Sequence, residues 1–167
     1  IRGDQQWIFD QISKAIDNGF VALCLTVDLD AYGRRERDLA KRYKTTSRKS
    51  TIDPRHQMNF SWKDVEKIKN KFKIPIIIKG IATVEDSILA IENGIDVIYI
   101  SNHGGRQLDY GVGGCDLISD ISDAVNGKSK IFFDGGILRG TDVIKALSLG
   151  ADLVGLGRLQ CLSLIHI

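Results

Sequence analysis

The sequence predicts an α/β fold that is part of a (β/α)8 TIM barrel, with about strands 4 to 8 present. Short, wholly apolar runs, which are typical of strands buried on both faces, alternate with segments of helical periodicity. This alternation favours a parallel sheet with right-handed crossovers. Glycine and polar residues gather directly after the strands, where the loops of such a barrel build its active site.

The chain length limits how much of a barrel can be present, and the residues at the strand ends bear on the choice between two folds. A complete barrel needs about 250 residues, whereas the chain has 167, so some strands are expected to be missing. A doubly wound open sheet shares the same local pattern and is the alternative fold. It is disfavoured because no Gly-x-Gly-x-x-Gly follows the first strand and because every predicted strand ends in polar residues.

The predicted elements follow one another in a regular order. Ser61 and Thr83 are each followed three residues later by an aspartate, which is the spacing of a helix-capping box. Gly19 and Gly150 stand where the helical periodicity stops, as expected of C-terminal caps. Helices are therefore expected over residues 4–18, 62–72, 84–93, 116–125 and 141–149, and strands over residues 20–27, 75–78, 96–100, 131–133 and 153–156.

Composition and charge disfavour several classes of protein. Residues 32–53 form a long polar connection rich in arginine and lysine, but Glu36 and Asp38 interrupt the positive charge and aromatics are sparse. The formal net charge is only +2, so no nucleic-acid partner is expected. No apolar run reaches the roughly 18 residues of a membrane span. The three cysteines show no metal-ligand spacing, so no metal is expected, and their odd number suits a reduced, intracellular compartment.

The most informative segment is residues 101–109, which read Ser-Asn-His-Gly-Gly-Arg-Gln-Leu-Asp. His103 stands at a strand end, where Gly104 and Gly105 leave the backbone bare for close approach of a ligand. Arg106 can hold a carboxylate in a bidentate contact while the histidine takes a proton. A base and a carboxylate clamp on one loop indicate oxidation of an acid that bears an adjacent hydroxyl. A histidine with a structural role in a capped loop is the alternative.

Two glycine-rich turns follow the last two predicted strands. Residues 134–140 and 155–158 each carry an arginine, which is typical of the phosphate site that barrels build at this position. Glycines needed only for tight turns explain either motif alone, but they explain the pair less well. Lys79 ends a strand made otherwise of isoleucines, and a lysine buried there needs an anionic partner, which we interpret as a ligand.

These motifs resemble, in the same order along the chain, those of the FMN-dependent α-hydroxy-acid dehydrogenases and oxidases. That family includes glycolate oxidase, lactate oxidase, mandelate dehydrogenase and flavocytochrome b2. Residues 101–107 match its active-site signature, which is highly specific, and the resemblance spans residues 3–158. The other matching segments are residues 25–28, 33–38, 78–80, 134–136 and 157–158.

The resemblance implies a role for each matching residue. His103 would be the base, and Asp28 would orient it and stabilise its imidazolium. Arg106 and Arg35 would bind the substrate carboxylate. Lys79 would lie at the N1/O2 edge of the FMN ring. The remaining cofactor contacts would come from Thr26 and Ser101 at the ring, and from Asp134, Gly135, Gly136, Ile137, Arg139, Gly157 and Arg158 at the ribityl chain and phosphate.

The implied reaction is oxidation of a small L-2-hydroxy acid, such as lactate or glycolate, to the 2-oxo acid with reduction of FMN. Oxygen, a cytochrome or a quinone would accept the electrons, and members of the family are often homotetramers. Two alternatives stay open at this point. A phosphate-binding barrel of another class, such as an isomerase, leaves His103 with Arg106 unexplained. An incomplete barrel that does not turn over fits the chain as given, because the first three strands are missing from it.

Residues 159–167 depart from the pattern of the family. They are apolar and lack a helix cap. The family usually continues after Gly157 and Arg158 with a proline and a helix, whereas here Leu159 follows. We therefore expect the barrel part to cover residues 1–158 and residues 159–167 to be non-native sequence that arose from a frameshift or a read-through.

Overall fold

In the computed structural model, which describes residues 3–29, 33, 36–43, 58–108 and 110–164, the chain forms a five-stranded parallel sheet. The strands lie side by side in the order of the sequence. They are β1 (Leu23–Thr26), β2 (Ile76–Ile81), β3 (Val97–Ile100), β4 (Lys130–Asp134) and β5 (Leu153–Gly155). The predicted α/β fold with a parallel sheet is confirmed, and the arrangement is consistent with part of a barrel.

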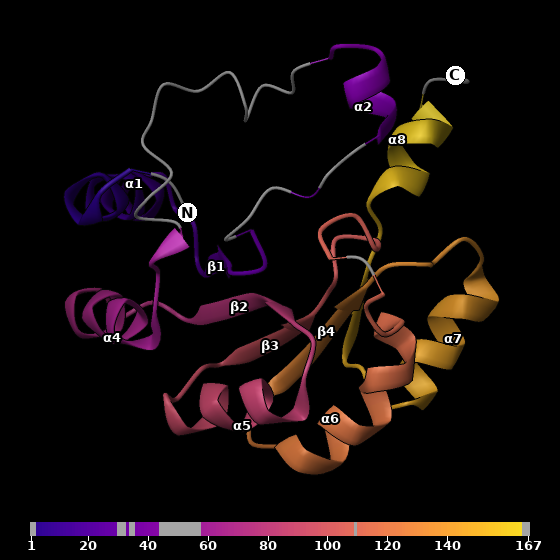
Figure 1. The fold of residues 1–167 in the computed structure, drawn as a ribbon. Coiled ribbons are helices and arrows are strands. Elements are labelled where there is room, and N and C mark those ends of the chain that lie inside the picture. Colours follow the sequence, from indigo (N-terminus) through magenta and orange to yellow (C-terminus); the bar gives the residue numbers. More distant parts are fainter. Residues whose placement is uncertain (1–2, 30–32, 34–35, 44–57, 109, 165–167) are drawn as a thin grey trace.

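The main helices are arranged in an arc along one side of the sheet (Figure 1). They are α1 (Gln5–Asp17), α4 (Trp62–Lys71), α5 (Val84–Glu92), α6 (Ile118–Val125) and α7 (Gly140–Ser148), and the short 3-10 helix η2 (Gly114–Leu117) directly precedes α6. All of them lie within about two residues of the predicted bounds. The predicted caps form, because Thr83 Oγ1 accepts a hydrogen bond from the Asp86 N–H and the Asp64 carboxylate accepts one from the Ser61 N–H, both at 3.1 Å.

Two short helices have no counterpart in the prediction. Helix α2 (Glu36–Ala40) lies within the polar connection, and α8 (Arg158–Leu164) covers most of the segment that we expected to be non-native. No glycine or proline interrupts either helix, and leucine, glutamine, arginine and alanine are good helix formers. The non-native origin of residues 159–167 stays a prediction.

The first strand begins at Leu23 rather than at the predicted Phe20. The N–H groups of Gly19 and Phe20 donate instead to the carbonyls of Ile16 (2.9 Å) and Ala15 (3.1 Å), which is the Schellman pattern that ends a helix. Gly19 has a φ of +82° there, a conformation that glycine adopts without strain. Because these two N–H groups close α1, strand pairing starts later and the Phe20 side chain is left 65% exposed.

Two aspartates link neighbouring strands at the opposite edge from the predicted site. The carboxylate of Asp96, just before β3, accepts a hydrogen bond from the Ile76 N–H at the start of β2 (2.8 Å). The carboxylate of Asp152, just before β5, accepts one from the Ile131 N–H in β4 (2.8 Å). Each contact ties the loop before one strand to the strand beside it, and so supports the register of the pair.

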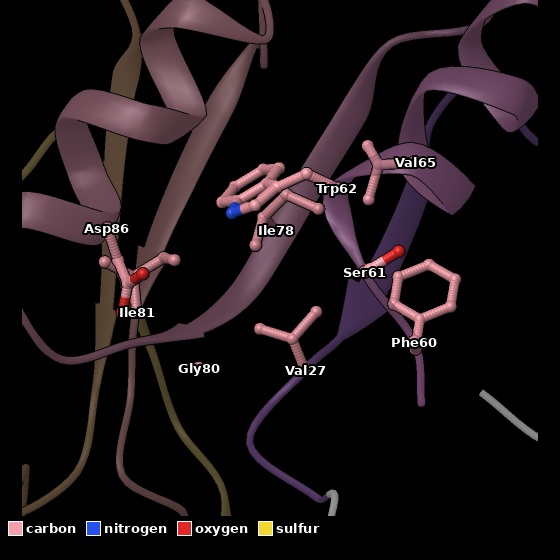
Figure 2. Close-up of a pocket in the computed structure, with 9 residues that line it drawn as sticks. All are labelled: Val27, Phe60, Ser61, Trp62, Val65, Ile78, Gly80, Ile81 and Asp86. Atoms are coloured by element: carbon pink, nitrogen blue, oxygen red, sulfur yellow. The ribbon is translucent and has the colours of Figure 1, made fainter. Parts of the chain in front are cut away.

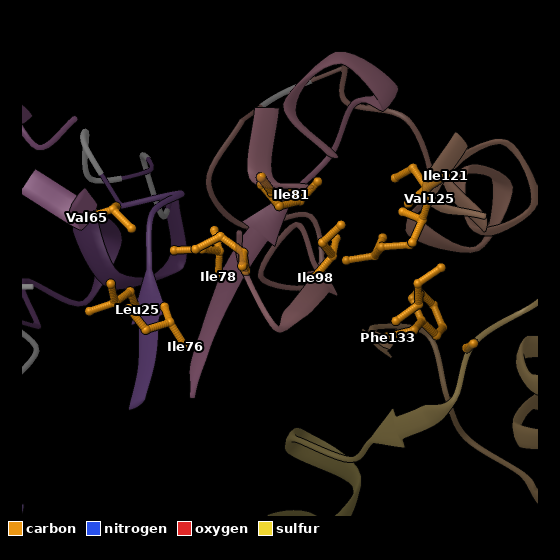
Figure 3. Close-up of a cluster of buried hydrophobic side chains, with 14 of the residues drawn as sticks. Leu25, Val65, Ile76, Ile78, Ile81, Ile98, Ile121, Val125 and Phe133 are labelled. Atoms are coloured by element: carbon orange, nitrogen blue, oxygen red, sulfur yellow. The ribbon is translucent and has the colours of Figure 1, made fainter. Parts of the chain in front are cut away.

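The two faces of the sheet differ in burial. The face toward the helices is apolar and enclosed: Ile78, Ile98 and Phe133 are at most 1% exposed, and Ile121 and Val125 of α6 belong to the same cluster (Figure 3). The opposite face, which we call the inner face, corresponds to a barrel interior. Its side chains stand at the alternate strand positions: Cys24, Thr26, Ile77, Lys79, Val97, Tyr99, Phe132, Asp134 and Leu153.

Three features of the described residues bear on partners and ligands. No helix among them is both long and apolar enough to cross a membrane. No group of three His, Cys, Asp or Glu side chains among them is placed to hold a metal ion. The cysteines Cys24, Cys115 and Cys161 carry no disulfide.

Candidate active site

A histidine and an aspartate from different strand ends form a polar pair at the carboxyl edge of the sheet. Asp28 follows β1 and His103 follows β3, and His103 Nδ1 lies 2.6 Å from Asp28 Oδ2. The two side chains are 26% and 14% exposed, respectively. Because a carboxylate only accepts hydrogen bonds, this contact favours a proton on Nδ1 and leaves the lone pair of Nε2 for a ligand. The structure thus brings together the two residues predicted to act as base and orienting group.

The loop that carries the histidine has a left-handed backbone. His103, Gly104 and Gly105 have φ values of +55°, +65° and +69°, a region that a non-glycine residue enters only under constraint. Asn102 holds this turn, since its side-chain oxygen accepts from the Gly105 N–H (3.0 Å) and its amide nitrogen donates to the Val112 carbonyl (3.2 Å). The sequence prediction missed this role of Asn102, although its place beside the histidine in the motif was a signal.

Asp28 packs directly against a glycine. The register of β2 shifts between Lys79 and Ile81, which is a β-bulge, and Gly80 lies in it with a φ of +114°. A Cβ on Gly80 would lie 2.7 Å from the Asp28 Cβ and 2.8 Å from its Cγ, so only glycine leaves room for the aspartate. Gln107 Nε2 donates to the Asp28 carbonyl (3.3 Å). The second carboxylate oxygen, Oδ1, is buried and has no hydrogen-bond partner among the described residues.

A second polar cluster lies beside the first and joins three strands. Lys79 Nζ donates to Ser101 Oγ at 2.6 Å and forms an ion pair with Asp134 Oδ2 at 2.9 Å, while Ser101 Oγ donates to Asp134 Oδ1 at 2.5 Å. Thr26 pairs with Lys79 in the register of β1 and β2. The anionic partner that we expected a ligand to supply for Lys79 is therefore Asp134 of the chain itself. Charge balance alone does not require a ligand at this position.

Two further groups on the inner face titrate away from their ordinary values. Burial, the negative charge of Asp134 and a hydrogen bond to it raise the pKa of Tyr99 to about 12, so the phenol stays protonated. Burial also raises the pKa of the Cys24 thiol, which the positive charge of Lys79 only partly offsets. The sequence prediction missed both, although strand alternation places Tyr99 on the same side as Ser101.

The two glycine-rich turns lie at the same edge, after β4 and β5. Gly135 and Gly136 have φ values of +107° and +71°. No described atom lies within 4 Å of the place that a Cβ would take on Gly136 or Gly157, so the backbone is bare there. Such a backbone lets a phosphate approach closely. Arg158 Nη2 donates to the Gly104 carbonyl at 3.4 Å, which ties the second turn to the histidine loop.

The remaining predicted site residues take different positions. Ile137 is buried in the core, so only its backbone can face a cofactor. Arg139 directly precedes α7. Arg106 is exposed on the histidine loop, and its carbonyl packs so closely against Gly33 that a Cβ there would overlap it. Arg35 lies outside the described residues.

A separate cavity of about 240 Å³ lies on the helix side of the sheet, near the starts of α4 and α5 (Figure 2). Ile78 and Trp62 are among its apolar walls, and Asp86 lines it as well. Neither His103 nor Lys79 is among its lining residues. The cavity is therefore distinct from the polar clusters at the carboxyl edge.

The known proteins that match this chain are dehydrogenases and oxidases. A family model described as FMN-dependent dehydrogenase matches residues 1–166. A peroxisomal (S)-2-hydroxyacid oxidase of Arabidopsis thaliana is 39% identical over 88% of this chain and 46% of that protein. An L-lactate dehydrogenase (cytochrome) of Saccharomyces cerevisiae is 40% identical over 90% of this chain and 29% of that protein.

Solved structures agree with these relatives. A crystal structure of mandelate oxidase with (S)-2-phenylpropionate matches with a TM-score of 0.82 and 37% identity, over 93% of this chain and 46% of that one. A mandelate oxidase variant with an FMN adduct matches with a TM-score of 0.81 and 37% identity, over 93% and 47%. The chain thus spans about half the length of these relatives, or less. The family model covers almost the whole chain, which confirms the predicted resemblance: the chain belongs to the FMN-dependent dehydrogenase family.

Proposed function

We propose that the protein oxidises a small L-2-hydroxy acid, such as lactate or glycolate, to the 2-oxo acid, with FMN as its cofactor. The observation that carries this proposal is the 2.6 Å contact of His103 with Asp28, at the same sheet edge as the Lys79 cluster. A base oriented by a carboxylate suits the abstraction of a hydroxyl proton. The names of the relatives, an (S)-2-hydroxyacid oxidase and an L-lactate dehydrogenase, support this substrate class.

The residues at this edge fit FMN. The cofactor requires donors along its ring, partners for its ribityl hydroxyls, and a cationic stretch of bare backbone for its phosphate. When bound, FMN would accept the hydrogen of the substrate C2 as a hydride equivalent, which together with the hydroxyl proton completes the two-electron oxidation. The lysine and serine of the polar cluster supply donors, and two glycine turns supply bare backbone. We assign the ring to Thr26, Lys79 and Ser101, and the ribityl chain and phosphate to Asp134, Gly135, Gly136, Ile137, Arg139, Gly157 and Arg158.

The chain's own side chains then divide the work on the substrate. His103 takes the proton of the 2-hydroxyl on Nε2, and Asp28 stabilises the resulting imidazolium through its contact with Nδ1. Arg106 and Arg35 hold the substrate carboxylate, for which a guanidinium offers two parallel donors. Gly33 stands two residues before Arg35 and packs against the histidine loop, which supports this pairing of the two arginines.

We further infer that β1 to β5 correspond to strands 4 to 8 of the barrel. The electron acceptor is proposed to be oxygen, a cytochrome or a quinone, and the relatives that are named as oxidases and as a cytochrome-linked dehydrogenase support the first two. The full-length protein is proposed to be an intracellular homotetramer. An isomerase-like phosphate-binding barrel is not supported by these relatives.

Anaerobic reduction of the bound flavin tests the proposal. Full-length protein reconstituted with FMN is mixed with L-lactate, glycolate or L-mandelate without oxygen, and the visible flavin absorbance is followed. We expect at least one of these acids to bleach the flavin, and D-lactate, the matched control, to leave it unchanged. Protein that takes up no FMN, or that holds FMN which none of these three acids reduces, would contradict the proposal.

A further inference from the structure

Tyr99 stands in the middle of the inner face, on the central strand β3. It pairs in register with Lys79 on β2 and with Phe132 on β4. Its ring packs edge-on against Phe132, with the centroids 5.8 Å apart, and Lys79 Nζ lies 4.7 Å from the ring centroid. The aromatic body of Tyr99 is thus accounted for by packing, whereas its partly buried hydroxyl requires a polar partner.

A glycine on β5 makes room for this hydroxyl. A Cβ on Gly155 would overlap the Tyr99 hydroxyl oxygen and would lie 3.4 Å from the Asp134 Cβ. Gly155 does not have a left-handed backbone, so its conformation does not demand glycine. Glycine inside a strand weakens the strand and often marks a close approach. The missing side chain at Gly155 is therefore explained by the space that the Tyr99 hydroxyl takes.

The hydroxyl lies next to Asp134, because the Cβ position of Gly155 is close to both residues. The Asp134 carboxylate already accepts from Ser101 Oγ (2.5 Å) and pairs with Lys79 Nζ (2.9 Å). Burial, and next the negative charge of Asp134 with a hydrogen bond to it, raise the pKa of Tyr99 to about 12, so the phenol keeps its proton. Asp134 is thus paired with Lys79 and Ser101, and the protonated Tyr99 hydroxyl lies beside it at the Gly155 position.

We propose that Tyr99 is a positioning residue for Asp134, and that Gly155 lacks a side chain in order to admit the Tyr99 hydroxyl. The inference rests on the proposed function, in which Asp134 contacts the ribityl chain of FMN and Lys79 contacts the ring. With Tyr99 present, a phenol O–H stands beside the carboxylate, in addition to the Ser101 and Lys79 donors. Without Tyr99, the charge of Asp134 falls more fully on Lys79, and its positive field at the flavin ring weakens.

The test uses Tyr99→Phe, Gly155→Ala and the double variant in the full-length protein, with Gly111→Ala as the control. Gly111 has an ordinary φ and no described atom within 4 Å of a Cβ position. Tyr99→Phe should raise the dissociation constant of FMN about tenfold, as expected for loss of a hydrogen bond to a charged group. It should also shift the midpoint potential of bound FMN to a more negative value, because the ring loses part of the Lys79 field. Gly111→Ala should change neither quantity.

Thermal melting of the FMN-free protein provides a readout that does not depend on the cofactor. Gly155→Ala should lower the melting temperature when Tyr99 is present. In the Tyr99→Phe background it should lower the melting temperature much less, because the hydroxyl that the Cβ would overlap is gone and the remaining contact, to the ring carbon Cζ, is 3.3 Å. Equal effects of Gly155→Ala in both backgrounds would overturn the pairing, and an unchanged FMN affinity and potential in Tyr99→Phe would overturn the positioning role. Wild-type protein that binds no FMN refutes the proposed function instead, and the melting cycle still decides the pairing.

Discussion

The helix-facing side and the inner face belong to the same five strands, but different parts of the protein cover them. On the helix-facing side, Ile98 and Phe133 are fully buried, because the helix that follows each strand folds back over it. On the inner face, Leu153 is 45% exposed, because the residues that would cover a barrel interior come from strands on its far side. Local βα units thus build one face, whereas the other depends on distant parts of a barrel.

The polar contacts of the candidate site depend neither on the covering helices nor on distant strands of a barrel. Asp28 meets His103 across β2, and Lys79 meets Asp134 across β3, so each contact joins strands of this sheet. The described residues therefore already hold the geometry of the base and of the lysine cluster. Stability and site geometry are separable in this chain, since the apolar interior depends on distant strands and the polar contacts do not.

The largest effect is expected when residues 1–167 are expressed by themselves. The inner face would then meet water, and β1 and β5, the edge strands of the described sheet, would offer unpaired backbone groups. A deficit of ~400 Å² of apolar burial at about 25 cal/mol per Å² amounts to about 10 kcal/mol, which is the whole stability of a typical domain. We expect self-association, no cooperative melt and no FMN uptake, as measured by light scattering, calorimetry and absorbance. A monomer with a cooperative melt and bound FMN would show that the inner face needs no cover.

The next effect separates chemistry from stability at the carboxyl edge. In the full-length protein, His103→Gln removes the proposed base while keeping a polar side chain of similar size. Loss of general base catalysis should lower turnover roughly 10²- to 10⁴-fold. FMN content and the melting temperature should stay close to wild type, because neither the helix-facing core nor the phosphate turns depend on the imidazole. Unchanged steady-state kinetics would remove His103 from the mechanism.

A smaller effect is expected from Gly80→Ala, which pushes against Asp28 without touching the histidine. A Cβ at Gly80 would lie 2.7 Å from the Asp28 Cβ, so the aspartate must move. A displacement of about 1 Å at a catalytic group lowers the rate up to about 100-fold, and we expect a loss of roughly 10- to 100-fold in kcat with a smaller change in KM. Gly127→Ala is the matched control, since Gly127 also has a positive φ (+73°) but no described atom near a Cβ position. Equal losses in both variants would assign the effect to backbone strain alone.

The elements and the strand ends could be predicted because their signals are local. Capping spacings at Ser61 and Thr83 and glycine stops lie within a few residues of the elements that they bound. The placement of Asp28 and His103 at one edge followed from one topological rule, that parallel strands end at the same edge, whereas their pairing was implied by the resemblance to the family. The late start of β1 was not predicted. The apolar run of residues 20–27 indicates a strand from its first residue, but it does not show that the Phe20 N–H is already used to close the preceding helix.

Contacts that depend on register could not be predicted from the sequence. Whether Gly155 makes room for a turn or for the Tyr99 hydroxyl is decided by how β3, β4 and β5 align, and these residues lie far apart in the chain. The partner of Lys79 was assigned to a ligand for the same reason, since Asp134 becomes its neighbour only through the fold. Gly80 stood inside a matching motif, but its contact with Asp28 appears only with the β-bulge.

The smallest expected effect lies at the edge opposite the candidate site. A hydrogen bond from Lys130 (2.8 Å), and next the Ile131 N–H, lower the pKa of Asp152. A lowered folded-state pKa gives stability that is present above the unfolded pKa of about 3.9 and is lost as the pH falls through the folded value. In the full-length protein, Asp152→Asn should cost less than about 1 kcal/mol at pH 7, as for an exposed ion pair.

The sign of the pH dependence gives the sharper measurement of this contact. Stability should fall less steeply in Asp152→Asn than in wild type as the pH is lowered below about 4, because the variant has no carboxylate to protonate at this position. Lys130→Met removes the partner rather than the carboxylate and should flatten the same window in part, since the Ile131 N–H remains as a donor. Urea unfolding at a series of pH values measures both slopes. Slopes identical to wild type in both variants would mean that the contact between Lys130 and Asp152 adds nothing to stability or to the strand register.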